Sequence, residues 1–135
     1  MSEPTIEQFM SRAPHTIGHG QTLEAAHRMM REHDIRHLPV LDARQLTGIV
    51  SQRDLHMIEA LGVDPKQVKV SEAMTQGTYT IAPGTSVRKV AAEMAEHKYG
   101  CAVVVENERV VGVFTTVDAM RALSQLLEEN VARAR

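Results

Sequence analysis

Apolar residues recur at helical spacing in two separate stretches of the chain. Each stretch carries an i, i+3, i+7 stripe, formed by Leu23, Ala26 and Met30 in the first and by Val87, Val90 and Met94 in the second. This spacing gathers the apolar side chains on one face of an α-helix. Thr22 and Ser86 each precede a stripe, at the position where a hydroxyl side chain caps the first helical turn. The pattern predicts two amphipathic helices with matching starts.

Short runs rich in apolar residues follow each predicted helix and are separated by polar turns. These runs predict four strands, over residues 37–41, 46–50, 101–105 and 109–114. Brief extended pieces and closing helices complete the pattern, at residues 15–17 and 79–81, about 51–61, and about 115 to beyond 127. Pro39 has no backbone N–H to donate, so it predicts that the first of the four strands lies at the edge of its sheet.

The chain contains an internal repeat at a constant offset. Shifted by 64 residues and without a gap, residues 10–55 align on residues 74–119, with Gly48 on Gly112 and Asp54 on Asp118 among the identical pairs. A repeat of this kind decides the architecture, because each copy is one supersecondary unit. We therefore expect two copies of a β-α-β-β-α unit and an α/β (α+β) fold class.

One copy of about sixty residues is only marginally stable by size, so we expect the two copies to pack their sheets together. The predicted boundaries are a first repeat, a linker, a second repeat and a helical tail, at residues 1–61, 62–69, 70–127 and 128–135. In the last helix, Leu123, Leu126 and Leu127 can dock on the neighbouring copy or on a second chain.

The composition excludes several classes of protein. With 135 residues, 43% of them hydrophobic, and a net charge of −2, the chain is expected to be globular rather than disordered. A pI near 6.4, no basic run and 3% aromatic residues argue against a nucleic-acid partner. The valine run Val103–Val105 is far shorter than the ~20 apolar residues of a membrane helix. With no signal core and the single Cys101, we expect a cytoplasmic protein with no membrane contact.

A short pattern recurs where the last strand of each copy leads into a helix. It reads Gly48-Ile-Val-Ser51-Gln-Arg-Asp54 in the first copy and Gly112-Val-Phe-Thr115-Thr-Val-Asp118 in the second. A hydroxyl followed three residues later by an acidic residue is a capping box, which stabilises a helix start by about 1 kcal/mol without any ligand. The same place also suits a nucleoside phosphate, because helix amides attract phosphate, a carboxylate accepts from ribose hydroxyls, and glycine lets a ligand or a second backbone approach. Both interpretations stay open at this point.

The duplicated unit with these junction motifs resembles a pair of CBS domains (cystathionine-β-synthase-type repeats) over about residues 6–127. The supporting segments are the two junction motifs, Arg36-His37-Leu-Pro-Val-Leu and Ala25-Ala-His-Arg-Met-Met. The resemblance implies that the repeats pack with pseudo-two-fold symmetry into a Bateman module with two clefts. Such modules commonly bind AMP, ADP or ATP, and some bind S-adenosylmethionine, NAD or metal ions. They regulate a fused or separate effector protein, and two modules often pair into a dimer.

The resemblance also assigns nucleotide-binding residues in both copies. Asp54 and Asp118 match ribose-binding aspartates, and Ser51 and Thr115 match hydroxyls near the ribose and phosphate. The other matched positions lie on the base-contacting segment, the cleft wall and the helix start: Thr16, Ile17, Ile35, Arg36, His37, Pro39 and Arg53 in the first copy, and Thr80, Ile81, Tyr99, Gly100, Cys101 and Thr116 in the second.

The two copies are not equivalent in charge. Arg36, His37 and Arg53 give the first copy cationic groups that can neutralise phosphate, through charge-assisted bonds of about 1.5–3 kcal/mol each. The second copy has Gly100, Cys101 and Val117 at those positions. We therefore expect unequal occupancy of the two clefts.

Other chemistry finds less support. His33 and His37 have the i, i+4 spacing of metal ligands on a helix, but the helix is predicted to stop near Asp34, so no metal site is expected. Cys101 is expected to be a small core residue. No nucleophile, base and orienting acid stand at a recognisable spacing, so we expect no enzyme activity.

The leading hypothesis is therefore a regulatory sensor that needs no cofactor, takes an adenine nucleotide (AMP, ADP or ATP) as its ligand, forms a homodimer and acts on a separate effector protein. The alternatives are a ligand-free interaction scaffold, whose junction motifs only cap helices, and a CBS pair that senses S-adenosylmethionine, NAD or a metal ion.

Overall fold

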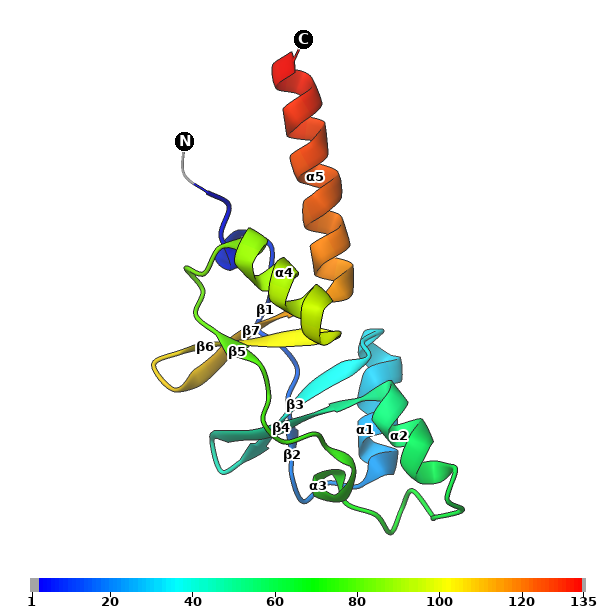
Figure 1. Ribbon diagram of the computed structural model, residues 1–135. Helices are drawn as coiled ribbons and strands as arrows, with labels where there is room; N and C mark the ends of the chain where they lie inside the picture. Colours follow the sequence, from blue (N-terminus) through cyan, green and yellow to red (C-terminus); the bar gives the residue numbers. More distant parts are fainter. Residues whose placement is uncertain (1–2, 135) are drawn as a thin grey trace. The chain divides into compact units, whose positions relative to one another are not determined.

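The computed structural model describes residues 3–134, which form two compact units (Figure 1). The first-repeat unit is Pro14–Thr78. The second-repeat unit joins the described residues up to Ala13 with those from Tyr79 onward. The predicted helices and strands all occur, with ends within two residues of the predicted ones.

The first-repeat unit is a three-stranded sheet with helices packed on it. Its elements are β2 (Ile17–Gly18), α1 (Leu23–His33), β3 (His37–Asp42), β4 (Gln45–Ser51), α2 (Gln52–Glu59) and α3 (Val70–Ala73). Strand β2 runs parallel to β3, which runs antiparallel to β4. Helices α1 and α2 lie side by side next to this sheet (Figure 1). The predicted stripe of α1 is buried with Leu38, Val40 and Val50 of the sheet.

The second-repeat unit has the same arrangement with one more strand. Its elements are η1 (Ile6–Gln8), β1 (Ser11–Arg12), β5 (Thr80–Ile81), α4 (Val87–His97), β6 (Cys101–Glu106), β7 (Arg109–Thr115) and α5 (Thr116–Ala134). The strand order is β1-β7-β6-β5, and only β5 and β6 run parallel. Its core holds the predicted α4 stripe together with Phe114 and Ala122. Among residues 3–134, no helix combines the length and the apolar content needed to span a membrane.

Both predicted N-caps are confirmed. The Ala25 N–H donates to Thr22 Oγ1 at 3.2 Å, and the Lys89 N–H donates to Ser86 Oγ at 3.1 Å. Helix α1 ends at the left-handed residue Asp34, as predicted. These local signals are reliable because a cap hydrogen bond lies within three residues of the chain.

The prediction of an edge strand at Pro39 is wrong, because β3 lies between β2 and β4. In the second-repeat unit, the Val103 N–H at the equivalent position donates to Tyr79 O at 2.9 Å, and β5 begins at Thr80. Pro39 cannot donate this bond, and β2 begins one position later in the repeat register, at Ile17. A central strand accepts the proline because its parallel pairing starts beyond it.

The short segment around the start of each repeat hydrogen-bonds to the start of the first long helix, α1 or α4, of the other repeat. In the first-repeat unit, the Val70 N–H donates to Gln21 O at 2.7 Å and the Leu23 N–H to Val68 O at 3.0 Å. The residues 64 positions away make the same two bonds in the second-repeat unit, from Ile6 to Thr85 and from Val87 to Pro4. The compact units are thus offset from the sequence repeats, and the boundaries given above stay a prediction.

Alanine at Gly48 or Gly112 should lower the free energy of unfolding by about 1–3 kcal/mol. A Cβ at Gly48 would lie 2.7 Å from Thr75 O and 2.8 Å from Met74 Sδ. One at Gly112 would meet the equivalent neighbours, Met10 Sδ at 2.6 Å and Ser11 O at 3.0 Å. The motif glycines therefore leave room for a crossing segment of the backbone. The sequence allowed either this role or the close approach of a ligand.

Urea unfolding of the two glycine variants measures this effect. Gly20→Ala is the matched control, since a Cβ there meets nothing within 4 Å. A control variant destabilised as much as Gly48→Ala would show that the loss does not come from the crowded crossing.

Candidate functional site

The junction of β4 and α2 carries a reciprocal capping box. Asp54 N–H donates to Ser51 Oγ at 3.0 Å, and Ser51 N–H donates to Asp54 Oδ2 at 2.9 Å. The capping interpretation of this motif therefore holds in the structure. Asp54 stays half-exposed, and within residues 3–134 its Oδ1 accepts no hydrogen bond. The carboxylate can accept further donors while it caps the helix.

Cationic and polar groups surround Asp54. His37 is the direct cross-strand partner of Ser51, and the Gln52 N–H donates to Arg36 O at 2.9 Å. Burial lowers the pKa of His37; the charge of Asp54 works in the opposite direction, and the charge of Arg36 adds to the lowering. The strand pairing of His37 with Ser51 and the bond from Gln52 to Arg36 bring Arg36 and His37 close to Asp54 at the start of α2.

The lowered pKa of His37 predicts a loss of stability in mild acid. The unfolded chain binds a proton at this residue near pH 6.5, whereas the folded chain binds it only at lower pH. The stabilising contribution is therefore complete above about pH 6.5 and is lost as the pH falls through the folded pKa. Thermal unfolding between pH 8 and pH 5 should show a smaller decline for His37→Gln than for the parent chain. Equal declines in the two proteins would contradict this assignment.

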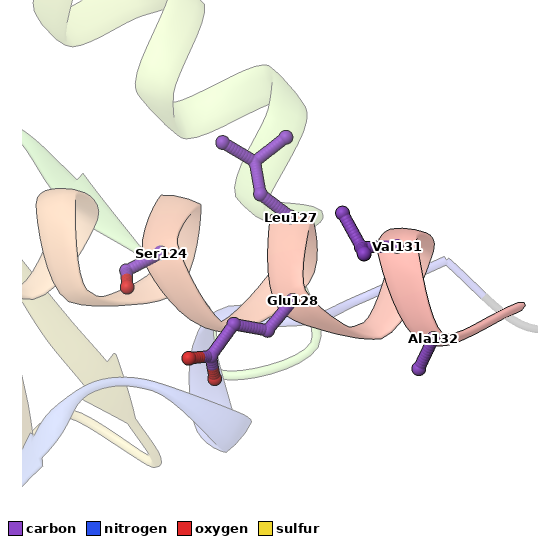
Figure 2. A pocket seen from close by; sticks show the side chains of 5 residues that line it. All are labelled: Ser124, Leu127, Glu128, Val131 and Ala132. Carbon is purple, nitrogen blue, oxygen red and sulfur yellow. The ribbon is translucent and has the colours of Figure 1, made fainter. Parts of the chain in front are cut away.

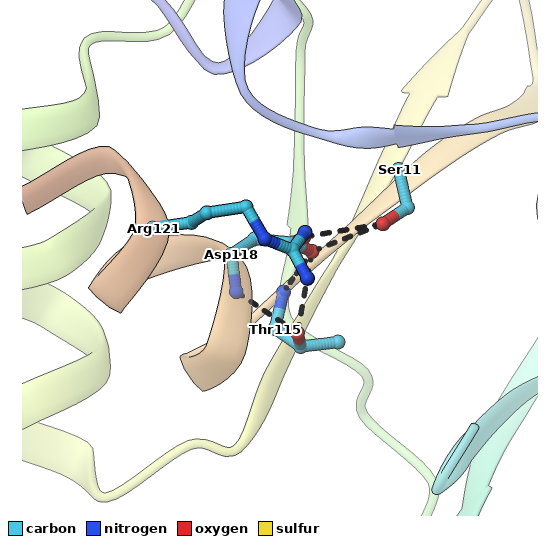
Figure 3. Close-up of polar contacts among 4 residues, drawn as sticks. All are labelled: Ser11, Thr115, Asp118 and Arg121. Atoms are coloured by element: carbon cyan, nitrogen blue, oxygen red, sulfur yellow. Dashed lines mark hydrogen bonds and ion pairs between the residues drawn. The ribbon is translucent and has the colours of Figure 1, made fainter. Parts of the chain in front are cut away.

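The junction of β7 and α5 holds its aspartate much more tightly (Figure 3). Asp118 is only 3% exposed. Its Oδ2 accepts from the Thr115 N–H at 2.9 Å and from Thr115 Oγ1 at 3.2 Å. Ser11 Oγ donates to the carboxylate at 3.2 Å, and Arg121 Nη1 lies 3.2 Å from Oδ1. Both oxygens of Asp118 are therefore occupied by groups of its own unit.

The two aspartates thus differ in what they can still bind. Asp54 has only Ser51 as a hydrogen-bond partner among the described residues, and Met57 stands where the second copy has Arg121. Residue Ser11 reaches Asp118 because β1 pairs with β7 at Val113. Sequence analysis missed Ser11 and Arg121. The repeat register offered a signal for Ser11, since it aligns on the hydroxyl residue Thr75.

The amides at both helix starts are largely used within the fold. Besides the capping bonds, the Gln52 N–H donates to Arg36 O and the Thr116 N–H donates to Gly100 O, at 2.9 and 3.2 Å. An anion at either junction therefore finds fewer free amides than an uncapped helix start would offer. Side-chain cations also differ between the junctions: Arg36 and Arg53 lie near the first, whereas Arg121 at the second already pairs with Asp118.

The remaining candidates differ in accessibility. Ile17, Pro39 and Cys101 are buried. Arg36, Arg53, Thr80, Tyr99 and Thr116 are exposed, and the half-exposed set is Thr16, Ile35, His37, Ser51, Ile81, Gly100 and Thr115. Burial raises the pKa of the Cys101 thiol to about 12, and the charge of Asp118 adds to this effect. Cys101 is thus a core residue, as expected.

A line of aromatic rings in the second-repeat unit was not predicted. The Tyr79 and Tyr99 rings are 5.1 Å apart, and the His97 ring stacks on Tyr99 at 5.2 Å. The Tyr79 hydroxyl donates to Glu93, and burial together with this bond raises the pKa of Tyr79. In the first copy, His15 aligns on Tyr79 and stacks on His33 at 3.6 Å. Each copy therefore has an aromatic pair at the short extended segment that precedes its first helix.

The histidine spacing does not form a helical metal site. His33 is the last residue of α1, and His37 is the first residue of β3. Within residues 3–134, no three His, Cys, Asp or Glu side chains gather as potential metal ligands.

Comparison with known proteins identifies the architecture. The sequence model of the CBS domain matches residues 6–58 and 70–125. The chain belongs to the CBS domain family. It contains two CBS repeats in a mixed α+β fold, a type of module that is typically regulatory.

Relatives align along most of the chain. Hypoxic response protein 1 of Mycobacterium tuberculosis is 32% identical over 124 residues, which are 90% of this chain and 86% of that protein. The AcuB structure from Vibrio cholerae is 34% identical, covers 97% of this chain and 98% of its own, and has a TM-score of 0.87. The CBS pair of protein MJ0100, solved with 5′-methylthioadenosine and S-adenosylmethionine, is 27% identical, with a TM-score of 0.79 and coverage of 92% and 98%.

Proposed function

We propose that this CBS pair is a non-enzymatic sensor that binds an adenosine nucleotide (AMP, ADP or ATP) at the β4–α2 junction of the first repeat. The observation that carries the proposal is the contrast between the two aspartates. Asp54 is half-exposed with one oxygen available, whereas both oxygens of Asp118 are engaged and the side chain is buried.

The residues around Asp54 divide the ligand between them. Asp54 accepts hydrogen bonds from the ribose hydroxyls, as acidic residues do in dinucleotide-binding folds. Arg36, Arg53 and His37 supply the positive charge and donors for phosphate, in place of the helix amides that the fold already uses. The backbone of Thr16 and Ile17 faces the base.

Adenosine chemistry is favoured over other ligands by the comparisons. The MJ0100 CBS pair was solved with two adenosine derivatives, neither of which carries a phosphate, so it supports the adenosine part of the ligand only. The cationic residues Arg36 and Arg53 favour a phosphorylated adenosine in this chain. S-adenosylmethionine and NAD stay as alternatives that the same ribose contact accommodates.

The output of such a sensor is a change of packing felt by another protein. A ligand shifts a conformational equilibrium only by its difference in affinity for the two states. We expect the chain to act in the cytoplasm on a separate effector protein, and to form a homodimer. The lone buried Cys101 agrees with a reducing compartment.

Thermal unfolding with AMP, ADP, ATP, NAD and S-adenosylmethionine tests the proposal. A ligand at 100 times its Kd stabilises the folded chain by about 2.7 kcal/mol, which raises the unfolding temperature by several degrees at this size. Zinc chloride is a separate arm of the experiment. A shift with zinc alone would favour metal sensing, and no shift with any compound would favour the scaffold, in which Ser51 and Asp54 only cap α2.

A further inference from the structure

One face of α5 is apolar and exposed along most of its length. Its large residues are between 49% and 64% exposed: Val117, Met120, Leu123, Leu127 and Val131. The buried residues of this helix, Asp118 and Ala122, lie on the opposite side, since successive residues turn by about 100°. The helix therefore has an inner face that packs on its unit and an outer face that nothing covers in the described chain.

The outer face has the spacing of a two-helix seam. Steps of three and four residues alternate along Val117, Met120, Ser124, Leu127, Val131 and Ala134. This is the a/d pattern of paired helices, carried over almost three heptads. Leu127 and Val131 project from the same side of the helix, beside a shallow hollow also lined by Ser124 (Figure 2). A heptad seam fits another helix better than a flat surface.

We infer that α5 pairs antiparallel with α5 of a second copy of this chain. Val117, Ser124 and Val131 are the a positions of this pattern, and Met120, Leu127 and Ala134 are the d positions. When the a positions of one helix pack on the d positions of the other, Met120 meets the partner's Val131, and Ser124 meets the partner's Leu127. Arg121, which flanks the seam, then stands opposite the partner's Glu128, and the two-fold axis makes this ion pair twice. On the other flank, Leu123 meets the partner's Asn130.

Charge favours the antiparallel direction. A parallel pair would bring Leu123 next to the partner's Glu128 and Arg121 next to Thr116, with no opposite charges facing each other. Arg121 is 72% exposed and uses Nη1 for Asp118, so it keeps donors for a second carboxylate. A helix whose flanking charges match only its own reversed copy is self-complementary, which is why the occupant is a second copy.

This inference rests on the homodimer expected above and specifies its surface; it does not depend on nucleotide binding. Light scattering should give the mass of a dimer for the full chain. Leu127→Asp should raise the dimer dissociation constant about tenfold or more, because it puts a charge in the seam. Glu128→Lys should weaken the dimer at low salt, whereas Glu129→Lys, the same change one residue away on the inner side, should not.

Cysteine cross-linking fixes the direction. A mixture of Met120→Cys and Val131→Cys chains should form a mixed disulfide under mild oxidation, because residue 120 of one helix faces residue 131 of the other, whereas neither variant alone should cross-link. The parent chain is the control, because its own Cys101 is buried. A monomeric parent chain, a dimer unaffected by Leu127→Asp, or cross-linking of Val131→Cys to itself, as a parallel pair would give, would each overturn the inference. If light scattering gives the mass of a monomer, the apolar face of α5 does not bind a second copy and is free to bind a different protein. Unchanged nucleotide shifts in Leu127→Asp separate this result from the proposed function.

Discussion

Asp118→Ala is expected to lower the free energy of unfolding by about 3–5 kcal/mol. The substitution removes a buried carboxylate that accepts from the Thr115 amide and hydroxyl, from Ser11 Oγ and from Arg121. It leaves the half-buried Thr115 donors without an acceptor, and it releases β1 from the start of α5. The cost of unpaired buried donors adds to the loss of the hydrogen bonds themselves. Chemical denaturation of the variant measures the change.

Asp54→Ala provides the matched comparison. It removes the same residue from the same motif, but here only the reciprocal cap with Ser51 is lost. The expected cost is about 1 kcal/mol. Equal destabilisation by the two variants would contradict the view that Asp118 organises its junction while Asp54 does not.

Asp54→Asn is expected to weaken adenosine nucleotide binding about 10- to 100-fold. The amide keeps one acceptor, and so keeps the helix cap, but it loses the charge that strengthens the bonds from two ribose hydroxyls. Isothermal titration with the ligand that gives the largest thermal shift measures the dissociation constant.

Asp42→Asn controls for the change in net charge. Asp42 is the last residue of β3, whereas His37 begins that strand beside the candidate site. The affinity of this control should equal that of the parent chain. If Asp54→Asn also binds with the parent affinity, the ribose role assigned to Asp54 is wrong.

Local signals in the sequence predicted most of the fold. The helix stripes, the caps Thr22 and Ser86, and the strands were found because each depends on residues close in the chain. The exchange of leading segments between the copies was not predicted, since it depends on which of two similar surfaces a short segment meets. The error at Pro39 has a related cause: the sequence reveals a missing N–H but not where a two-residue partner strand begins.

The candidate site was predicted in outline but not in its asymmetry. Both aspartates follow a hydroxyl by three residues, so sequence spacing makes them equivalent. The difference comes from Ser11, 107 residues away along the chain, and from the side chain that stands three residues after each aspartate. Such long-range partners are settled by tertiary packing, which a single sequence does not display.

A crystal structure of the chain grown with AMP tests the central claim most directly. The account predicts AMP at the β4–α2 junction, with ribose hydroxyls within hydrogen-bond distance of Asp54 and phosphate near Arg36 or Arg53, while Asp118 keeps its bonds to Ser11 and Arg121. A ribose on Asp118 with Ser11 displaced, or AMP absent from the Asp54 junction at saturating concentration, would contradict it.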